Sequence, residues 1–136
     1  MDAGRVNGEA RPRFIAGRDR PRGVRRLLGA FYNSWLGFRG AWREEEAFRQ
    51  ECLLALVVLP GGILFGHTGV ERALLVGPML LILIVELLNS AIETAIDRIG
   101  VERHALSGLA KDLGSAAVFV SFVLLIASWV LIALDH

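Results

Sequence analysis

The feature that most constrains this chain is a run of 22 residues, 113–134, that contains no charged side chain. About 20 consecutive apolar residues are enough for a helix to cross the roughly 30 Å hydrocarbon core of a bilayer. Two further candidates precede it: residues 48–65, and residues 73–99, whose first thirteen positions also lack charge. With 54% hydrophobic residues in 136, this pattern favours an all-α membrane protein with three transmembrane helices over a soluble helical bundle.

The segment before the first span is rich in arginine. Eleven of the fifteen basic residues precede Cys52, and all eleven are arginines. Residues 1–22 mix them with glycine and proline without an apolar period, which is typical of a disordered basic tail. In residues 23–46, aromatic and leucine side chains recur at three- and four-residue steps. This spacing predicts an amphipathic helix on the membrane surface, broken near Gly37 or Gly40, at the start of a membrane domain covering 23–136.

The distribution of basic residues also predicts the topology. The arginine-rich segment lies on the cytoplasmic side by the positive-inside rule, and Arg98, Arg103 and Lys111 return to that side after the second span. We therefore expect a cytoplasmic N-terminus and an external C-terminus.

A polar stripe follows the apolar half of the second span. At 100° per residue, Glu86, Asn89, Ser90, Glu93 and Asp97 fall within an arc of about 100° on one helical face. Polar groups are costly within a membrane, and they mark functional sites there. The desolvated Glu86 suits a general base that takes up and releases a proton, whereas the wetter Glu93 and Asp97 suit a hard divalent cation.

A second acidic group stands where the first span begins. Glu44, Glu45 and Glu46 are followed by Glu51, and in the predicted topology they lie at the membrane level of Glu93. Two carboxylates from different helices at one depth are able to hold Mg²⁺ between them. For Glu44 and Glu46, a solvated charge cluster is the favoured interpretation.

The loop after the second span carries Glu102, Arg103, His104, Lys111 and Asp112. Its cations are able to meet phosphate groups, although an ordinary basic cytoplasmic loop has the same composition. A lone histidine such as His104 is more often a hydrogen-bonded loop residue than a metal ligand. The glycine-rich phosphate loops of soluble nucleotide-binding proteins are absent from the sequence.

Three motifs resemble the small integral-membrane diacylglycerol kinases of bacteria. They are Ala47-Phe48-Arg49-Gln50-Glu51, Val85-Glu86-x-Leu88-Asn89-Ser90-Ala91-Ile92-Glu93 and Ala110-Lys111-Asp112-x-Gly114-Ser115-Ala116-Ala117. The resemblance covers roughly residues 23–136. It implies a homotrimer in the bacterial inner membrane, with active sites shared between subunits, that uses Mg²⁺ and transfers the γ-phosphoryl group of ATP to diacylglycerol. It implies no nucleic-acid partner.

The resemblance also implies roles for individual residues. Glu86 is similar to the base that activates the lipid hydroxyl, with Asn89 as its polar neighbour, and Glu45 and Glu93 are similar to the Mg-ATP ligands. The other positions similar to nucleotide-binding ones are Arg26, Glu102, Arg103, His104, Lys111 and Asp112. The positions similar to lipid-binding ones are Arg26, Trp35, Arg49, Glu51, Glu86, Ser115 and Trp129.

Three alternatives stay open. A stripe of intramembrane carboxylates also occurs in transporters and channels, and polar side chains also hold helices together in assemblies without catalysis. Within the kinase interpretation, the runner-up substrate is undecaprenol, because the positions that contact acyl chains are generic apolar residues. The role of Asp97 is undecided, with pairing to a neighbouring arginine as one hypothesis.

Overall fold

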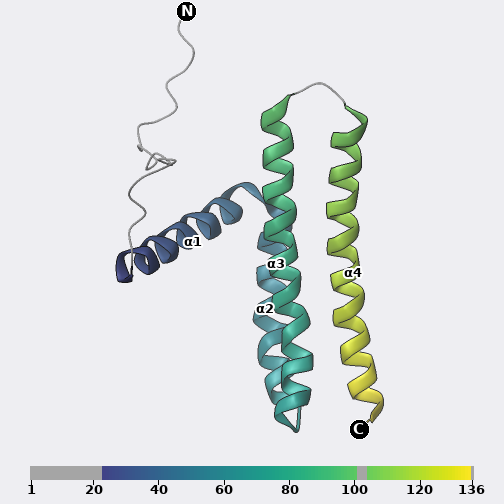
Figure 1. Cartoon of the computed structure of the whole chain (residues 1–136). Helices are drawn as coiled ribbons and strands as arrows, with labels where there is room; N and C mark the ends of the chain where they lie inside the picture. The colour runs from purple at the N-terminus through teal and green to yellow at the C-terminus, as the bar shows by residue number, and fades with distance from the viewer. Residues whose placement is uncertain (1–22, 101–103, 136) are drawn as a thin grey trace, which may run out of the picture. The chain divides into compact units, whose positions relative to one another are not determined.

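The computed structural model describes residues 23–100 and 104–135, which form four helices and no strand. These are α1 (Val24–Glu44), α2 (Glu46–Phe65), α3 (Gly69–Ile99) and α4 (Ala105–Asp135) (Figure 1). The predicted disordered tail, residues 1–22, lies outside the described residues, as do Glu102 and Arg103. Helices α2, α3 and α4 are each long and apolar enough to cross a membrane. The prediction of an all-α membrane protein with three spanning helices is therefore confirmed.

Helix α1 continues through Gly37 and Gly40, so the predicted break at these glycines is wrong. A glycine inside a helix costs only about 1 kcal/mol relative to alanine, and the helix formers around it outweigh that cost. The helix ends instead at Glu44, and the next residue, Glu45, has an extended backbone (φ −106°, ψ 112°). The chain divides after Trp35 into two compact units, and α2, α3 and α4 belong wholly to the second.

Two contacts fix the junction between the end of α1 and the start of α2. The Arg49 guanidinium donates hydrogen bonds from Nη1 to the carbonyl oxygens of Trp42 (3.0 Å) and Arg43 (3.3 Å). These carbonyls belong to the last turn of a helix, where backbone acceptors lack partners within the helix. The rings of Phe38 and Phe48 stack with centroids 6.4 Å apart. These contacts between the two helices stabilise the turn at Glu45.

The spanning helices extend beyond their apolar runs. Helix α4 begins at Ala105, well before the uncharged stretch at Leu113, because polar residues outside the hydrocarbon continue the same hydrogen-bond ladder. Helix α3 begins after the N-cap Thr68, whose Oγ1 accepts from the Glu71 backbone N–H (3.2 Å). The Glu71 carboxylate in turn accepts from the Thr68 hydroxyl (3.1 Å) and from the His67 backbone N–H (2.7 Å). Apolar composition marks the hydrocarbon zone, whereas caps mark the helix ends.

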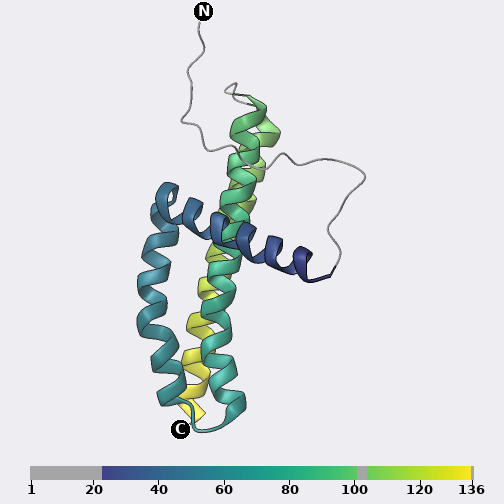
Figure 2. The same cartoon turned by 90° about the vertical axis from the view of Figure 1, so that its left-hand side faces the viewer.

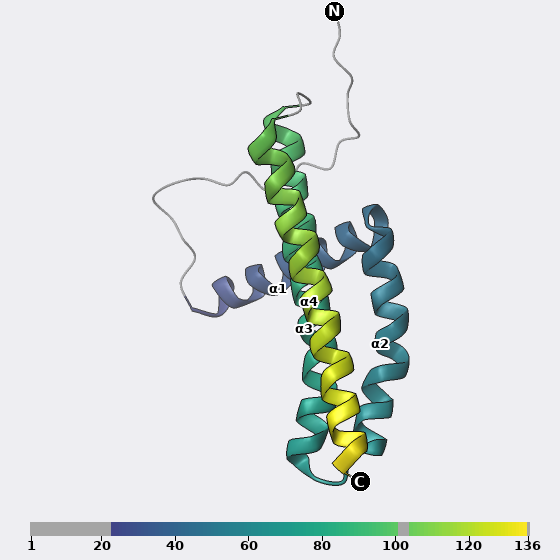
Figure 3. The same cartoon turned by 90° about the vertical axis from the view of Figure 1, so that its right-hand side faces the viewer.

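Helix α3 is central and packs against both α2 and α4. Figures 1 and 2 show α2 and α3 joined by the short connection at residues 66–68, and Figure 3 shows α4 running along α3 in the opposite direction. The core consists of Ala55 from α2, Met79 and Ile82 from α3, and Leu125 from α4. Met79 and Ile82 are completely buried.

Trp129 joins all three helices at the end opposite the polar stripe. Its indole Nε1 donates to the Leu75 carbonyl on α3 (3.2 Å), and its ring stacks on Phe65 of α2 with centroids 6.0 Å apart. Gly61 leaves room for the indole, since a Cβ there would lie 3.3 Å from Trp129 Cη2. This contact fixes the height of α4 against the α2–α3 pair.

We expect Trp129→Phe to lower the stability of the folded protein by at least about 0.6 kcal/mol, the mean value of an interhelical hydrogen bond in a membrane protein. Phenylalanine keeps an aromatic ring, but it is smaller than the indole and has no N–H to donate to Leu75. Unfolding in detergent micelles measures the effect, with Trp42→Phe at an exposed tryptophan as the control. Equal stability of the two variants would contradict a role for the indole N–H.

Candidate active site

The polar stripe lies on α3 and passes from a buried to an exposed environment. Glu86 is only 4% exposed and Ser90 9%, whereas the Asp97 side chain is 66% exposed. Asn89 and Glu93 are half-buried between them. The predicted gradient, dry at Glu86 and wetter toward Asp97, is confirmed. Glu86 continues the face that carries the buried Met79 and Ile82, which explains why it is the driest carboxylate of the stripe.

The helix register places Glu51 of α2 at the level of Glu86. A Cβ on Gly62 would lie 3.0 Å from Leu75 Cβ, so these two residues are opposite each other in the antiparallel pair. Glu51 and Glu86 are equally far along their helices from this contact, in the direction of the stripe. Glu51 is buried to 5% exposure, and its charge interacts with that of Glu86.

Two further carboxylates interact electrostatically with Glu86, namely Glu45 at the N-cap of α2 and Glu93 on α3. The structure therefore brings together the predicted base, Glu86, and the two predicted metal ligands. Like charges at this density repel each other unless a cation or bound protons neutralise them. Without such neutralisation the carboxylates would weaken the contact between the helices, which argues against a purely structural role.

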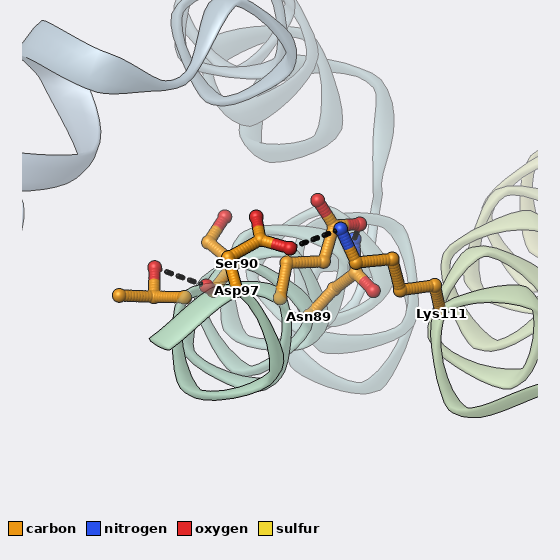
Figure 4. Close-up of polar contacts among 6 residues, drawn as sticks. Asn89, Ser90, Asp97 and Lys111 are labelled. Atoms are coloured by element: carbon orange, nitrogen blue, oxygen red, sulfur yellow. Dashed lines mark hydrogen bonds and ion pairs between the residues drawn. The ribbon is translucent and has the colours of Figure 1, made fainter. Parts of the chain in front are cut away.

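Asn89 links the stripe by donating from Nδ2 to Glu93 Oε1 (3.0 Å). The Thr94 hydroxyl donates to the Ser90 carbonyl (2.8 Å), one turn away (Figure 4). In the described part of the chain, Glu51 Oε2, Asn89 Oδ1 and Ser90 Oγ are buried and have no hydrogen-bond partner. Buried polar atoms are seldom left unpaired, so Glu51 Oε2 and Ser90 Oγ are candidates for contact with polar groups of a ligand, whereas Asn89 Oδ1 is packed against Gly114 of α4.

Asp97 pairs with Lys111 of α4, not with an arginine. The Lys111 ammonium donates to Asp97 Oδ1 at 2.6 Å, and Figure 4 shows the lysine reaching across from α4 to α3. The same ammonium interacts with the charge of Glu93. The pair therefore places a cation near the predicted metal ligand Glu93. The sequence left Asp97 without a role, because its partner lies on another helix.

Several predicted site residues make contacts outside the polar stripe or are exposed. His104 Nδ1 accepts a hydrogen bond from the Leu106 backbone N–H (3.2 Å) at the start of α4, as expected for a loop histidine. Arg49 is engaged at the junction of α1 and α2, and Trp129 lies at the opposite end of α3 from the stripe. Asp112 and Ser115 are exposed on α4. The nucleotide- and lipid-binding roles of these residues stay predictions.

Arg26 and Trp35 lie on α1 in the first unit of the chain and are exposed. Trp35 is 65% exposed, as expected of an aromatic side chain on an interfacial helix. Their roles toward lipid and nucleotide also stay predictions.

The sequence reasoning missed one residue at the site, Gly114 of α4. A Cβ at this glycine would overlap Asn89 Oδ1. A glycine at this place in the shared motif was visible in the sequence, but only the register of α4 against α3 reveals which side chain fills its space.

The Glu45 and Glu93 side chains supply carboxylate oxygens, which are the ligand type that Mg²⁺ prefers. Glu45 caps α2 with its backbone alone and makes no side-chain cap hydrogen bond, and one oxygen of Glu93 is bound by Asn89. Among the described residues, no group of three or more His, Cys, Asp and Glu side chains is arranged to enclose a metal. Mg²⁺ does not need such a cage, because it commonly takes one or two carboxylates and completes its shell with water and phosphate oxygens.

The chain is similar to known proteins over most of its length. The model of the family "Prokaryotic diacylglycerol kinase" matches residues 32–133. A diacylglycerol kinase of Pseudomonas aeruginosa is 49% identical over 112 residues, covering 82% of this chain and 91% of the relative. The diacylglycerol kinase of Escherichia coli K12 is 42% identical over 114 residues (84% and 93%), and that of Haemophilus influenzae 44% over 107 (79% and 91%).

The three spanning helices and the bacterial relatives together make this a bacterial membrane protein. The family match covers most of the chain, including α2, α3 and nearly all of α4. The chain belongs to the prokaryotic diacylglycerol kinase family.

Proposed function

We propose that this chain is an ATP-dependent lipid kinase that converts 1,2-diacylglycerol to phosphatidic acid and ADP, in the recycling of membrane lipid. The relatives named diacylglycerol kinase support the reaction. The observation that carries it is the buried Glu86 beside the more accessible Glu45 and Glu93. A carboxylate within the hydrocarbon meets the hydroxyl of a lipid, while those nearer water meet a soluble phosphate donor.

Glu86 acts as the general base in this proposal. The lipid hydroxyl oxygen forms a bond to the γ-phosphorus, its proton passes to Glu86, and the β–γ bridging oxygen leaves with ADP. Apart from this proton, phosphoryl transfer depends mainly on positioning and charge stabilisation. The unpartnered Glu51 Oε2 and Ser90 Oγ are available to polar groups of the lipid headgroup at the same level.

Glu45 and Glu93 would hold Mg²⁺ with ATP, and Asn89 keeps Glu93 oriented through its 3.0 Å hydrogen bond. The metal ion supplies charge neutralisation at the phosphate oxygens when bound. Lys111 stands beside Glu93 as a second positive group for the phosphates. The predicted contributions of Arg26, Glu102, Arg103, His104 and Asp112 to nucleotide binding belong to the same proposal.

The protein acts as a homotrimer with its N-terminus in the cytoplasm and its C-terminus on the periplasmic side. Two features support this part of the proposal. The arginines of the N-terminal segment favour the cytoplasmic side. Much of the apolar surface of α2 and α4 is exposed in a single chain, and it is available to lipid and to further copies.

Asp97 is expected to position Lys111, so Asp97→Asn should raise the KM for Mg-ATP about three- to tenfold. Exposed ion pairs add little to stability, and the thermal unfolding of this variant should match that of the wild type. Kinetics over a range of ATP concentrations measure the effect. Asp135→Asn, an exposed carboxylate at the far end of α4, is the control. A KM equal to that of the control would refute the positioning role.

ATP consumption by the detergent-purified protein, with and without added diacylglycerol, tests the proposed function. If the protein is a lipid kinase, its consumption of ATP should depend on both the lipid and Mg²⁺. Ion flux without ATP use would favour a transporter. A trimer that neither uses ATP nor transports ions would leave the stripe as an assembly contact.

A further inference from the structure

Gly114 of α4 differs from Gly62, the buried glycine between α2 and α3, in what lies against it. At Gly62, an added Cβ would meet Leu75 and Val76, which are apolar residues in the interface of α2 and α3. At Gly114, the three nearest atoms all belong to the side chain of Asn89, and the Cβ would overlap its Oδ1. The space of Gly114 is therefore filled by one polar side chain of the stripe.

The hydrogen bond to Glu93 decides which way the Asn89 amide points, and Gly114 leaves the space that the amide oxygen occupies. The amide oxygen faces Gly114 and has no hydrogen-bond partner in the described residues, while the NH₂ group donates to Glu93 Oε1. Turning the amide over would direct its oxygen at the Glu93 carboxylate, and two acceptors repel each other. A larger residue at 114 would displace the whole amide.

We propose that Gly114 is a positioning residue for the nucleotide and metal end of the site, acting through Asn89 on Glu93. This inference rests on the proposed function, in which Glu93 holds Mg-ATP. Because a side chain at 114 moves Asn89, Glu93 loses the donor that fixes one of its oxygens. The free carboxylate then samples other rotamers, and metal binding weakens. A displaced orienting partner of a metal ligand typically costs about 10- to 100-fold in affinity or activity.

Gly114→Ala and Gly108→Ala form a matched pair that tests the proposal. Both replace a glycine of α4, and a Cβ at Gly108 meets nothing within 4 Å. Each variant, as the full-length protein in detergent, is titrated with Mn²⁺ in the presence of a non-hydrolysable ATP analogue, and the free ion is followed by electron paramagnetic resonance. We expect Gly114→Ala to weaken Mn²⁺ binding at least tenfold and Gly108→Ala to leave it unchanged.

Kinase assays give the second measurement. Gly114→Ala should raise the Mg²⁺ concentration for half-maximal activity by a similar factor, with the KM for diacylglycerol within twofold of the wild type. A general packing defect would change both constants together. If Gly114→Ala binds Mn²⁺ like Gly108→Ala, the inference is wrong.

A double-mutant cycle with Asn89→Ala shows whether the effect passes through Asn89. The shorter side chain clears the space beside residue 114, so in this background Gly114→Ala should change Mn²⁺ binding less than twofold. The cycle remains informative if Gly114→Ala alone does not fold. The double variant is then expected to fold, because its shorter side chain at position 89 removes the overlap with residue 114. Additive losses would overturn the proposal. A wild-type protein without kinase activity would instead refute the proposed function, which separates the two failures.

Discussion

Replacing Glu86 by glutamine is expected to lower the rate of lipid phosphorylation by about two to four orders of magnitude, the range that a positioned general base contributes. Glutamine has nearly the same shape but cannot accept the hydroxyl proton. Glu86 is 4% exposed, so water does not readily replace it. The initial rate of phosphatidic acid formation at saturating Mg-ATP measures the effect.

Glu46→Gln is the control for this variant, because Glu46 is an exposed carboxylate at the start of α2 that has no assigned role. The Glu86→Gln protein should keep its helical content, its oligomeric state and its affinity for a non-hydrolysable ATP analogue. Turnover near the wild-type rate would eliminate Glu86 as the base. A lower rate that only follows loss of the oligomer would indicate a structural role.

Replacing Glu93 by glutamine is the other change with a large expected effect, and its effect should depend on Mg²⁺. The glutamine oxygen still accepts the hydrogen bond from Asn89, so the variant removes the charge while keeping the contact. We expect kcat/KM for Mg-ATP to fall by about two orders of magnitude at low Mg²⁺, equivalent to about 2.7 kcal/mol of transition-state stabilisation.

Initial rates over a range of Mg²⁺ concentrations measure this loss, again with Glu46→Gln as the control. Excess Mg²⁺ should restore part of the activity of Glu93→Gln and none of that of Glu86→Gln. The two variants thus separate metal binding from proton transfer. An unchanged Mg²⁺ dependence in Glu93→Gln would remove this residue from the metal site.

The sequence predicted the polar stripe well, because a stripe on one helix depends only on the helical period. Residues 86, 89, 90, 93 and 97 share a face in any regular helix, and the apolar run before Glu86 indicates its burial. The three spans follow in the same way from composition and length.

The individual side-chain partners across helices could not be predicted from the sequence, because they depend on the register of one helix against another. The partner of Asp97 is Lys111, fourteen residues along the chain and on α4. The fit of Asn89 against Gly114 and the bond from Trp129 to the Leu75 carbonyl likewise need the height of α4 relative to α3. The spacing of residues within one helix gives no information about the position of that helix along its neighbour.

Helix ends were also poorly indicated by hydropathy. The apolar run of α4 begins at Leu113, but the helix begins at Ala105 and carries Lys111 on its polar turns. This difference has a functional consequence, because a helical segment holds Lys111 at a fixed position beside the stripe. Placed in a loop, as composition suggests, the lysine would have no defined distance from Asp97.

The most direct test of the account is the transfer of labelled phosphate from γ-labelled ATP by the purified protein to diacylglycerol and, separately, to undecaprenol. We expect labelled phosphatidic acid at a rate far above that of undecaprenyl phosphate, with loss of both products in Glu86→Gln. Label in undecaprenyl phosphate alone would contradict the assignment of diacylglycerol as substrate, and label in neither lipid would contradict the kinase itself.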